Sequence, residues 1–254
     1  MSDAHREAIL DQFTRQAVPF ATAPSIRDEA ALRMIVEFSG TGPDDTVLDV
    51  ACGPGILACA FAKVARHVTG IDLTPAMLER ARLLQTEQGL TNLTWHHGDV
   101  LPLPFGDGAF TLVVSRFAFH HLLEPAAVLA EMRRVCAPGG MVMVIDSVPA
   151  PDKAAAFNAM ERLRDPSHTR ALAVAEHVAL FARVGLEPPR QTFYRLPTDL
   201  DGLLARSFPN PGDAERIRTM VERSLVDDGL DMATHRVGDT IRVSYPVAVL
   251  AARR

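Results

Sequence analysis

Three aspartates stand at or near the ends of short apolar segments: Asp49, Asp72 and Asp99. A carboxylate accepts hydrogen bonds from sugar hydroxyls and amino groups, and it neutralises a nearby cation. Gly53 and Gly55 follow the first apolar segment, and glycines in such a turn let a ligand approach the backbone closely. A carboxylate directed into that turn disfavours a pyrophosphate there. The three aspartates together suit a nucleoside that carries a positively charged amino-acid tail.

Two adjacent histidines, His120 and His121, follow the apolar segment 110–115. A neutral histidine can deprotonate a phenol, an enol or a ring nitrogen near neutral pH. The alternative is that one of them caps the next helix or packs beneath it. We interpret His120 as the stronger candidate for contact with a substrate.

The densest group of arginine and histidine in the chain is the segment 164–170. Its Arg164 and His168 could bind an anionic or carbonyl group. The competing interpretation is structural, because Asp165 followed by Pro166 is typical of the start of a helix. Both interpretations remain open, and Asp165 could serve both. Tyr194 is a lesser candidate that fits a core or surface position better.

Apolar segments alternate with helical patterns along most of the chain. The segments with strand character are 46–51, 67–72, 93–97, 110–115, 141–148, 190–196 and 239–252. Helices are expected between them, one starting at Thr74-Pro75 and stopping at Gly89. Such alternation predicts a Rossmann-like, doubly wound α/β fold with a mostly parallel, seven-stranded sheet and an antiparallel last strand. Pro246 suggests a bulge or an edge position in that last strand.

Composition excludes several classes of function. The chain has 254 residues, with 26 Lys and Arg against 31 Asp and Glu, so the net charge of −5 argues against nucleic-acid binding. Cys52, Cys59 and Cys136 lack the spacing of a zinc site, so we expect no metal and reduced thiols in a cytoplasmic protein. No apolar stretch is long enough to span a membrane.

Several segments, in order, resemble the class I S-adenosylmethionine-dependent methyltransferases. Val47–Gly55 resembles the first motif of that family, Gly70–Leu78 the second and His97–Val100 the third, and Arg134–Gly140 matches the turn before the fifth strand. Ser115–Leu122 is similar to the menaquinone/ubiquinone C-methyltransferase-like (methyltransferase type 11) subgroup. The resemblance covers residues 40–148. One departure is Ala51, where many members have glycine.

The resemblance implies S-adenosyl-L-methionine as the cofactor and S-adenosyl-L-homocysteine as the product. It places Asp49 near the ammonium group of the methionine portion, and Ser115 and Arg116 beside the sulfonium. The backbone against the methionine portion would come from Ala51, Cys52, Gly53 and Gly55.

The resemblance also implies how the nucleoside portion is held. Asp72 would accept hydrogen bonds from the ribose hydroxyls, and Leu73 and Met77 would lie beside the adenine. Asp99 would accept the adenine amino group, with Val100 flanking the ring.

One doubly wound methyltransferase domain over residues 1–254 accounts for all these elements, and we expect its N-terminal part to form a helical lid. The helical stripe Ile9, Leu10, Phe13, Ala17 and Phe20 is an ordinary core pattern, but it could also cover a site, because methyl transfer benefits from excluding water. The parts of the domain are the lid at 1–40, the cofactor-binding half at 41–148, inserted helices at 149–187, and strands and helices at 188–254.

Topology predicts where the methyl acceptor binds. The cofactor would occupy the carboxyl edge of the first three strands, so its methyl group would point towards the fourth. Only residues 1–25 and 149–187 are long enough to roof that position. We expect an acceptor pocket between the N-terminal helix, the end of the fourth strand and the inserted turn, with the catalytic candidates Arg116, His120, Arg164 and His168.

The resulting hypothesis is methyl transfer to carbon, oxygen or nitrogen of a small cyclic or aromatic metabolite by a monomer or homodimer. One alternative is a nicotinamide-dependent oxidoreductase, against which Asp49 and the absence of glycine at Ala58 argue. Another is a cofactor-binding partner protein that has lost catalysis, against which Arg116, His120 and Arg164 argue mildly.

Overall fold

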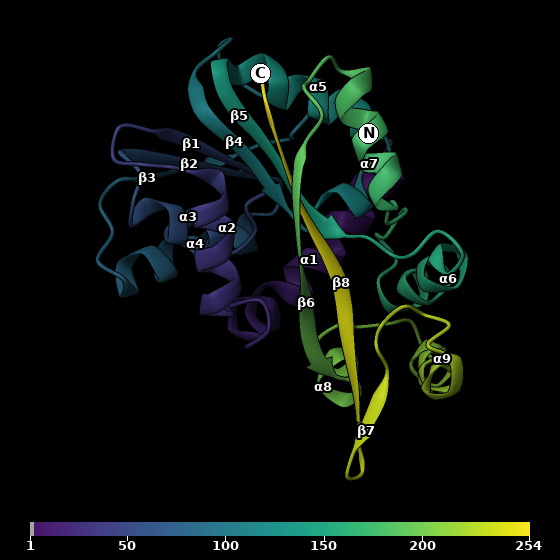
Figure 1. Cartoon of the computed structure of the whole chain (residues 1–254). Coiled ribbons are helices and arrows are strands. Elements are labelled where there is room, and N and C mark those ends of the chain that lie inside the picture. The colour runs from purple at the N-terminus through teal and green to yellow at the C-terminus, as the bar shows by residue number, and fades with distance from the viewer. Residues whose placement is uncertain (1–2) are drawn as a thin grey trace.

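One mixed sheet organises the protein, whose computed structural model describes residues 3–254 (Figure 1). The strand order is β3-β2-β1-β4-β5-β8-β6, and the short β7 pairs only with β8. The strands are β1 Thr46–Val50, β2 His67–Asp72, β3 Leu93–His97, β4 Phe110–Arg116, β5 Cys136–Ser147, β6 Arg190–Asp199, β7 His235–Val237 and β8 Thr240–Arg253. The first five run parallel, and β8 is antiparallel to both β5 and β6. The predicted fold class is confirmed.

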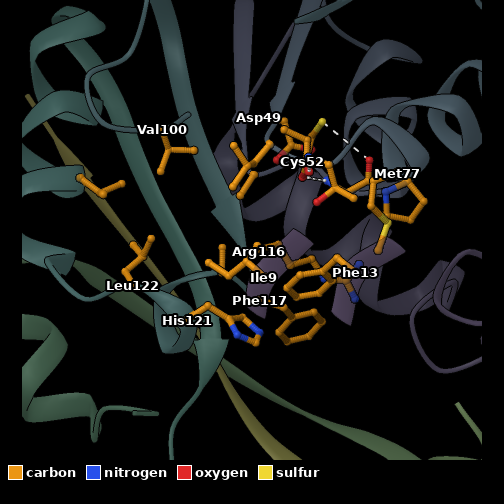
Figure 2. A pocket seen from close by; sticks show the side chains of 18 of the residues that line it. Ile9, Phe13, Asp49, Cys52, Met77, Val100, Arg116, Phe117, His121 and Leu122 are labelled. Carbon is orange, nitrogen blue, oxygen red and sulfur yellow. Dashed lines mark hydrogen bonds between the residues drawn. The ribbon is translucent and has the colours of Figure 1, made fainter. Parts of the chain in front are cut away.

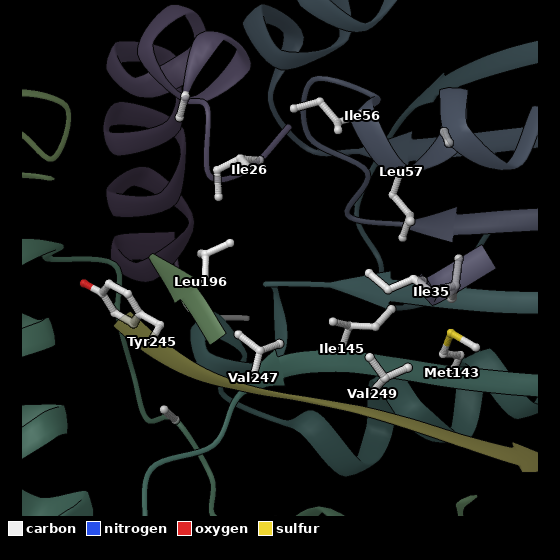
Figure 3. Close-up of a cluster of buried hydrophobic side chains, with 14 of the residues drawn as sticks. Ile26, Ile35, Ile56, Leu57, Met143, Ile145, Leu196, Tyr245, Val247 and Val249 are labelled. Atoms are coloured by element: carbon white, nitrogen blue, oxygen red, sulfur yellow. The ribbon is translucent and has the colours of Figure 1, made fainter. Parts of the chain in front are cut away.

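Helices cover both faces of the sheet. Along each strand, alternate side chains point to opposite faces: Val47 packs with α2 and α3, whereas Leu48 packs with α5 and α7. Figure 3 shows the first of these faces, where Ile145 of β5 and Val249 of β8 lie with Ile35 of α2. The helices are α1 Asp3–Thr22, α2 Glu29–Ser39, α3 Ile56–Ala62, α4 Pro75–Glu87, α5 Pro125–Val135, α6 Ala154–Arg164, α7 Val174–Arg183, α8 Leu200–Ala205 and α9 Asp213–Asp227.

Pro246 lies in no bulge, but it does occupy a local edge position: the pairing of β8 with β5 begins at Val247 and its pairing with β7 ends at Arg242, so this part of the expectation is confirmed. β8 runs between β5 and β6, and Pro246 pairs with Arg195 in an unbroken register. The carbonyl of Pro246 faces away from β6 and accepts from the amide of Val148, just beyond the end of β5. A missing N–H at this position therefore costs β6 no hydrogen bond.

The inserted section is helical only in part. Helices α6 and α7 are separated by an irregular segment, residues 165–173. Asp165 ends α6 rather than starting a helix, and its carboxylate accepts from the amide and hydroxyl of Ser167. The backbone amides of Thr169 and Arg170 both donate to the carbonyl of His120. These long-range bonds draw the segment back to His120, and residues 165–168 form a single turn, so the prediction of a helix start at Asp165-Pro166 is wrong.

The helix α1 packs against α4 and crosses the end of the sheet where β1, β2 and β4 finish (Figure 1). No helix within the described residues has the length and apolar character needed to cross a membrane.

Candidate active site

The turn after β1 adopts a backbone that favours glycine. Ala51 has φ of 56° and Gly55, which precedes α3, has φ of 75°. A Cβ added at Gly55 would lie 2.6 Å from the Trp95 ring and 2.9 Å from Cβ of Ala81. Gly55 is therefore required by packing as well as by its dihedral angle. Ala51 occupies a left-handed conformation that costs about 1–2 kcal/mol for a residue with a Cβ.

Asp72 ties this turn to the loop after β2. Its Oδ2 accepts from the amide of Gly53 and its Oδ1 from the amide of Thr74, both at 2.8 Å. Burial raises the pKa of this carboxyl, against the effect of these hydrogen bonds. The carboxylate thus orders the loops at the carboxyl edge of β1 and β2 while lining a cavity there.

That first cavity encloses about 1170 Å³, part of it open to solvent. Most of the predicted cofactor residues line it: Asp49, Ala51, Cys52, Gly53, Asp72, Leu73, Met77, Asp99, Val100 and Arg116. Figure 2 shows Asp49, Cys52 and Met77 on one side of the space, with Arg116 and Phe117 across from them.

Two predicted residues are not in the lining. Ser115 is 1% exposed, and its hydroxyl donates to the carbonyl of Val50, which joins β4 to the end of β1. The implied position of Ser115 beside the sulfonium is therefore not supported by the geometry. Gly55 lies behind the turn, against Trp95.

Two ionisable side chains of opposite type, Asp49 and Arg116, are buried at one end of the first cavity. Burial raises the pKa of Asp49 to about 8, and the nearby Arg116 charge acts in the opposite direction. Nη1 of Arg116 donates to the carbonyl of Ile26, while its Nε and Nη2 are buried without a partner among residues 3–254. These orphaned donors and the buried carboxylate fit the carboxylate and ammonium of an amino-acid tail.

Helix α1 closes this cavity from outside the sheet. Ile9, Phe13 and Phe20 line it, and Arg6 forms an ion pair with Asp99 at 2.9 Å. Three of the five residues of the apolar stripe therefore face the cavity, whereas Leu10 and Ala17 do not line it. Arg6 was not among the predicted site residues, because nothing near it in the sequence indicates its contact with Asp99.

A second cavity of about 730 Å³ adjoins the first. The residues that line both are Phe13, Phe20, Ile26, Phe117 and His121. Its further lining includes the predicted candidates His120 and Arg164, together with residues from β6, α8 and β8. Phe117 has φ of 56°, an uncommon conformation for an aromatic residue, and its ring lies under the Arg116 guanidinium at 4.6 Å.

His120 is held by a buried carboxylate. Its Nδ1 lies 2.5 Å from Oδ1 of Asp146, and its backbone amide donates to Oδ2 of the same residue. Burial opposes protonation, but the charge and the hydrogen bond of Asp146, together with the Glu161 charge, outweigh it, so the pKa of His120 lies above its usual value. Asp146, at the end of β5, was not predicted, although its place at a strand end matches that of Asp72 and was a usable signal.

The neighbouring imidazoles stay neutral. The His121 ring lies 4.2 Å and the His168 ring 5.4 Å from that of His120. Burial, reinforced by the His120 charge, lowers the pKa of His121 to about 4 and that of His168 to about 2.

The geometry gives no support to the predicted place of His168 in the acceptor pocket. Its Nε2 bonds Oδ1 of Asn158 at 2.7 Å, and the side chain lines neither cavity. It packs behind His120 because the segment after α6 is drawn back to the His120 carbonyl. Tyr194 on β6 also lines neither cavity.

Comparison with known proteins identifies the fold and the family. Residues 48–144 match the family model of a methyltransferase domain. The chain is 27% identical over 206 residues to the uncharacterized methyltransferase YcgJ of Bacillus subtilis, covering 80% of this chain and 81% of that protein. The crystal structure of YcgJ has a TM-score of 0.80, with 24% identity over 89% of this chain and 98% of that one.

Two other relatives are more similar over shorter regions. The uncharacterized protein YafE of Escherichia coli is 33% identical over 141 residues, 55% of this chain and 68% of YafE. The ubiquinone/menaquinone biosynthesis C-methyltransferase UbiE of Bdellovibrio bacteriovorus is 37% identical over 116 residues, about half of either chain. The methyltransferase domain model and the names of YcgJ and UbiE agree with the glycine turn and the strand-end aspartates: the chain belongs to the S-adenosylmethionine-dependent methyltransferases.

Proposed function

We propose that this enzyme methylates a small cyclic or aromatic molecule that binds in the second cavity. The observation that carries the proposal is the shared wall of the two cavities. Molecules bound in both would meet beside Phe13, Phe117 and His121, where α1 excludes water. The name of the relative UbiE, which specifies C-methylation in quinone biosynthesis, supports a ring-containing acceptor.

Bound S-adenosylmethionine supplies an electrophilic methyl group, and the chain must align a nucleophile with it. Asp72, Asp99 and the turn at Gly53 bind and orient the cofactor in this proposal. Asp49 and Arg116 pair with its ammonium and carboxylate.

His120 is the general base in this proposal. Because its Nδ1 faces the Asp146 carboxylate, the ring proton lies on Nδ1 and the Nε2 lone pair is free. Nε2 has no hydrogen-bond partner among residues 3–254, and His120 lines the second cavity. A hydroxyl or ring N–H of the acceptor would lose its proton to Nε2, and Asp146 would stabilise the resulting imidazolium.

Turnover with labelled S-adenosylmethionine tests the proposal. The enzyme is incubated with a panel of phenols, hydroquinones and nitrogen heterocycles, and methylated products are identified by mass spectrometry. We expect methyl transfer to at least one of these three classes of acceptor, and we expect that transfer to require His120. Cofactor binding by calorimetry without transfer to any ring compound, together with transfer to a protein or nucleic acid, would refute it.

A further inference from the structure

Polarity changes along the second cavity. The residues that it shares with the first are apolar except for His121: Phe13, Phe20, Ile26 and Phe117. The residues that line only the second cavity include the charged side chains of Glu161, Arg164, Asp165 and Arg206. The cavity is thus apolar beside the cofactor site and charged at its far end.

Three of these four charges are already matched within the protein. Arg164 bonds both carboxylate oxygens of Glu161 at 2.7–3.0 Å, and the Tyr245 hydroxyl donates to Glu161 at 2.9 Å. Asp165 accepts from the amide and hydroxyl of Ser167, and the Arg164 charge together with these hydrogen bonds lowers its pKa against the effect of burial. The nearby His120 is paired with Asp146.

Arg206, directly after α8, is the exception. Its Nη2 donates to the hydroxyl of Thr198 at 2.6 Å, and it forms no ion pair with any carboxylate of residues 3–254. Burial, together with repulsion from Arg164, lowers the pKa of this half-buried guanidinium. A guanidinium carries five donors, so most of those of Arg206 remain available to a ligand.

We propose that Arg206 binds a carboxylate of the acceptor, so that the substrate is a small aromatic acid. The inference rests on the proposed function and specifies its substrate class. The ring of such an acid would lie between Phe13, Phe20 and Phe117 near the cofactor site, with its carboxylate at the far end. A carboxylate accepts two parallel hydrogen bonds from a guanidinium, and it would give Arg206 the charged partner that the protein itself does not supply.

Binding of benzoate and of benzyl alcohol, its neutral counterpart, tests the inference without requiring turnover. Both are titrated by calorimetry into enzyme saturated with S-adenosylhomocysteine. We expect benzoate to bind about 10-fold or more tightly than benzyl alcohol, since hydrogen bonds to charged groups differ by that factor from neutral ones. Arg206→Gln should remove the preference, and Arg206→Lys should retain part of it.

The matched control is Arg223→Gln, which changes an exposed arginine on α9 and should leave benzoate affinity unchanged. Arg206→Gln should keep the affinity for S-adenosylhomocysteine and should not lower the melting temperature, because it removes an unmatched charge. A purely structural Arg206 would lower the melting temperature instead. Equal binding of the two probes, binding of neither, or undiminished benzoate binding by Arg206→Gln overturns the inference. Methylation of neutral phenols alongside any of these results would leave the proposed function standing.

Discussion

Asp72 holds two backbone amides and lines the cofactor cavity, so its carboxylate has both a local and a binding role. We predict that Asp72→Ala lowers affinity for S-adenosylmethionine by about 10-fold or more, because hydrogen bonds to a charged group contribute roughly 1.5–3 kcal/mol. Calorimetric titration measures the effect, with Asp44→Ala, an exposed aspartate, as the control. If a folded Asp72→Ala variant kept the same dissociation constant, Asp72 would not be the residue that binds the ribose hydroxyls.

The pKa of His120 lies above its usual value, so the pH dependence of turnover should report its deprotonation. As a base it acts when neutral, and kcat should therefore rise as pH increases through a value above about 6.5. In Asp146→Asn the effect of burial is no longer offset, so the pKa of His120 falls and the rise in kcat should move to lower pH. The maximum kcat should also drop, because the His120 ring loses the partner that fixes its tautomer.

The His120–Asp146 pair also makes the free energy of unfolding depend on pH. Because the folded-state pKa of His120 is raised, its stabilising charge pair with Asp146 is present below about pH 6.5 and lost as pH rises through the folded-state pKa. His235→Gln, at an exposed histidine, is the control for both measurements. A pH profile of kcat that is identical in Asp146→Asn would show that His120 does not act as the base.

At the scale of elements, α1 joins the two cavities. The ring of Phe13 lines both and meets the His121 ring edge-on at 5.0 Å. We predict that Phe13→Ala lowers kcat/KM about 10-fold or more by admitting water and loosening the acceptor, with a smaller effect on the affinity for S-adenosylhomocysteine. Val18→Ala on the same helix, at a residue 54% exposed, is the control. Equal kinetics of the two variants would refute a role for α1 as the lid.

At the scale of the whole molecule, Trp95 links the sheet to the cofactor turn. It pairs across strands with Gly70 and also packs on Gly55, and a Cβ added at Gly70 would lie 2.5 Å from its ring. Overpacking of this kind costs roughly 1–3 kcal/mol. We therefore predict that Gly70→Ala lowers the melting temperature by roughly 2–12 °C and weakens cofactor binding through the displaced turn.

Thermal unfolding followed by the fluorescence of Trp95, the single tryptophan, measures this effect. Gly106→Ala, where an added Cβ meets nothing within 4 Å, should leave the melting temperature unchanged. A normal melting temperature in Gly70→Ala would mean that the indole moves aside freely.

The sequence by itself determined seven of the eight strands, the parallel character of the sheet and the residues proposed to bind the cofactor. Those features depend on local patterns: apolar alternation, the turn at Gly53 and aspartates at strand ends. The sequence also showed that Ala51 stands where many family members have glycine, although it did not show the positive φ of Ala51.

Only the tertiary structure decided which ionisable side chains can take up or release a proton in the site. His120, His121 and His168 are alike as sequence, but Asp146, 26 positions from His120, lets that one imidazole take up a proton. The cap signal of Asp165 failed for the same reason, since hydrogen bonds from residues 169 and 170 to the distant His120 carbonyl outweighed it. Burial and charge pairing arise from contacts between distant segments, and a local pattern does not encode them.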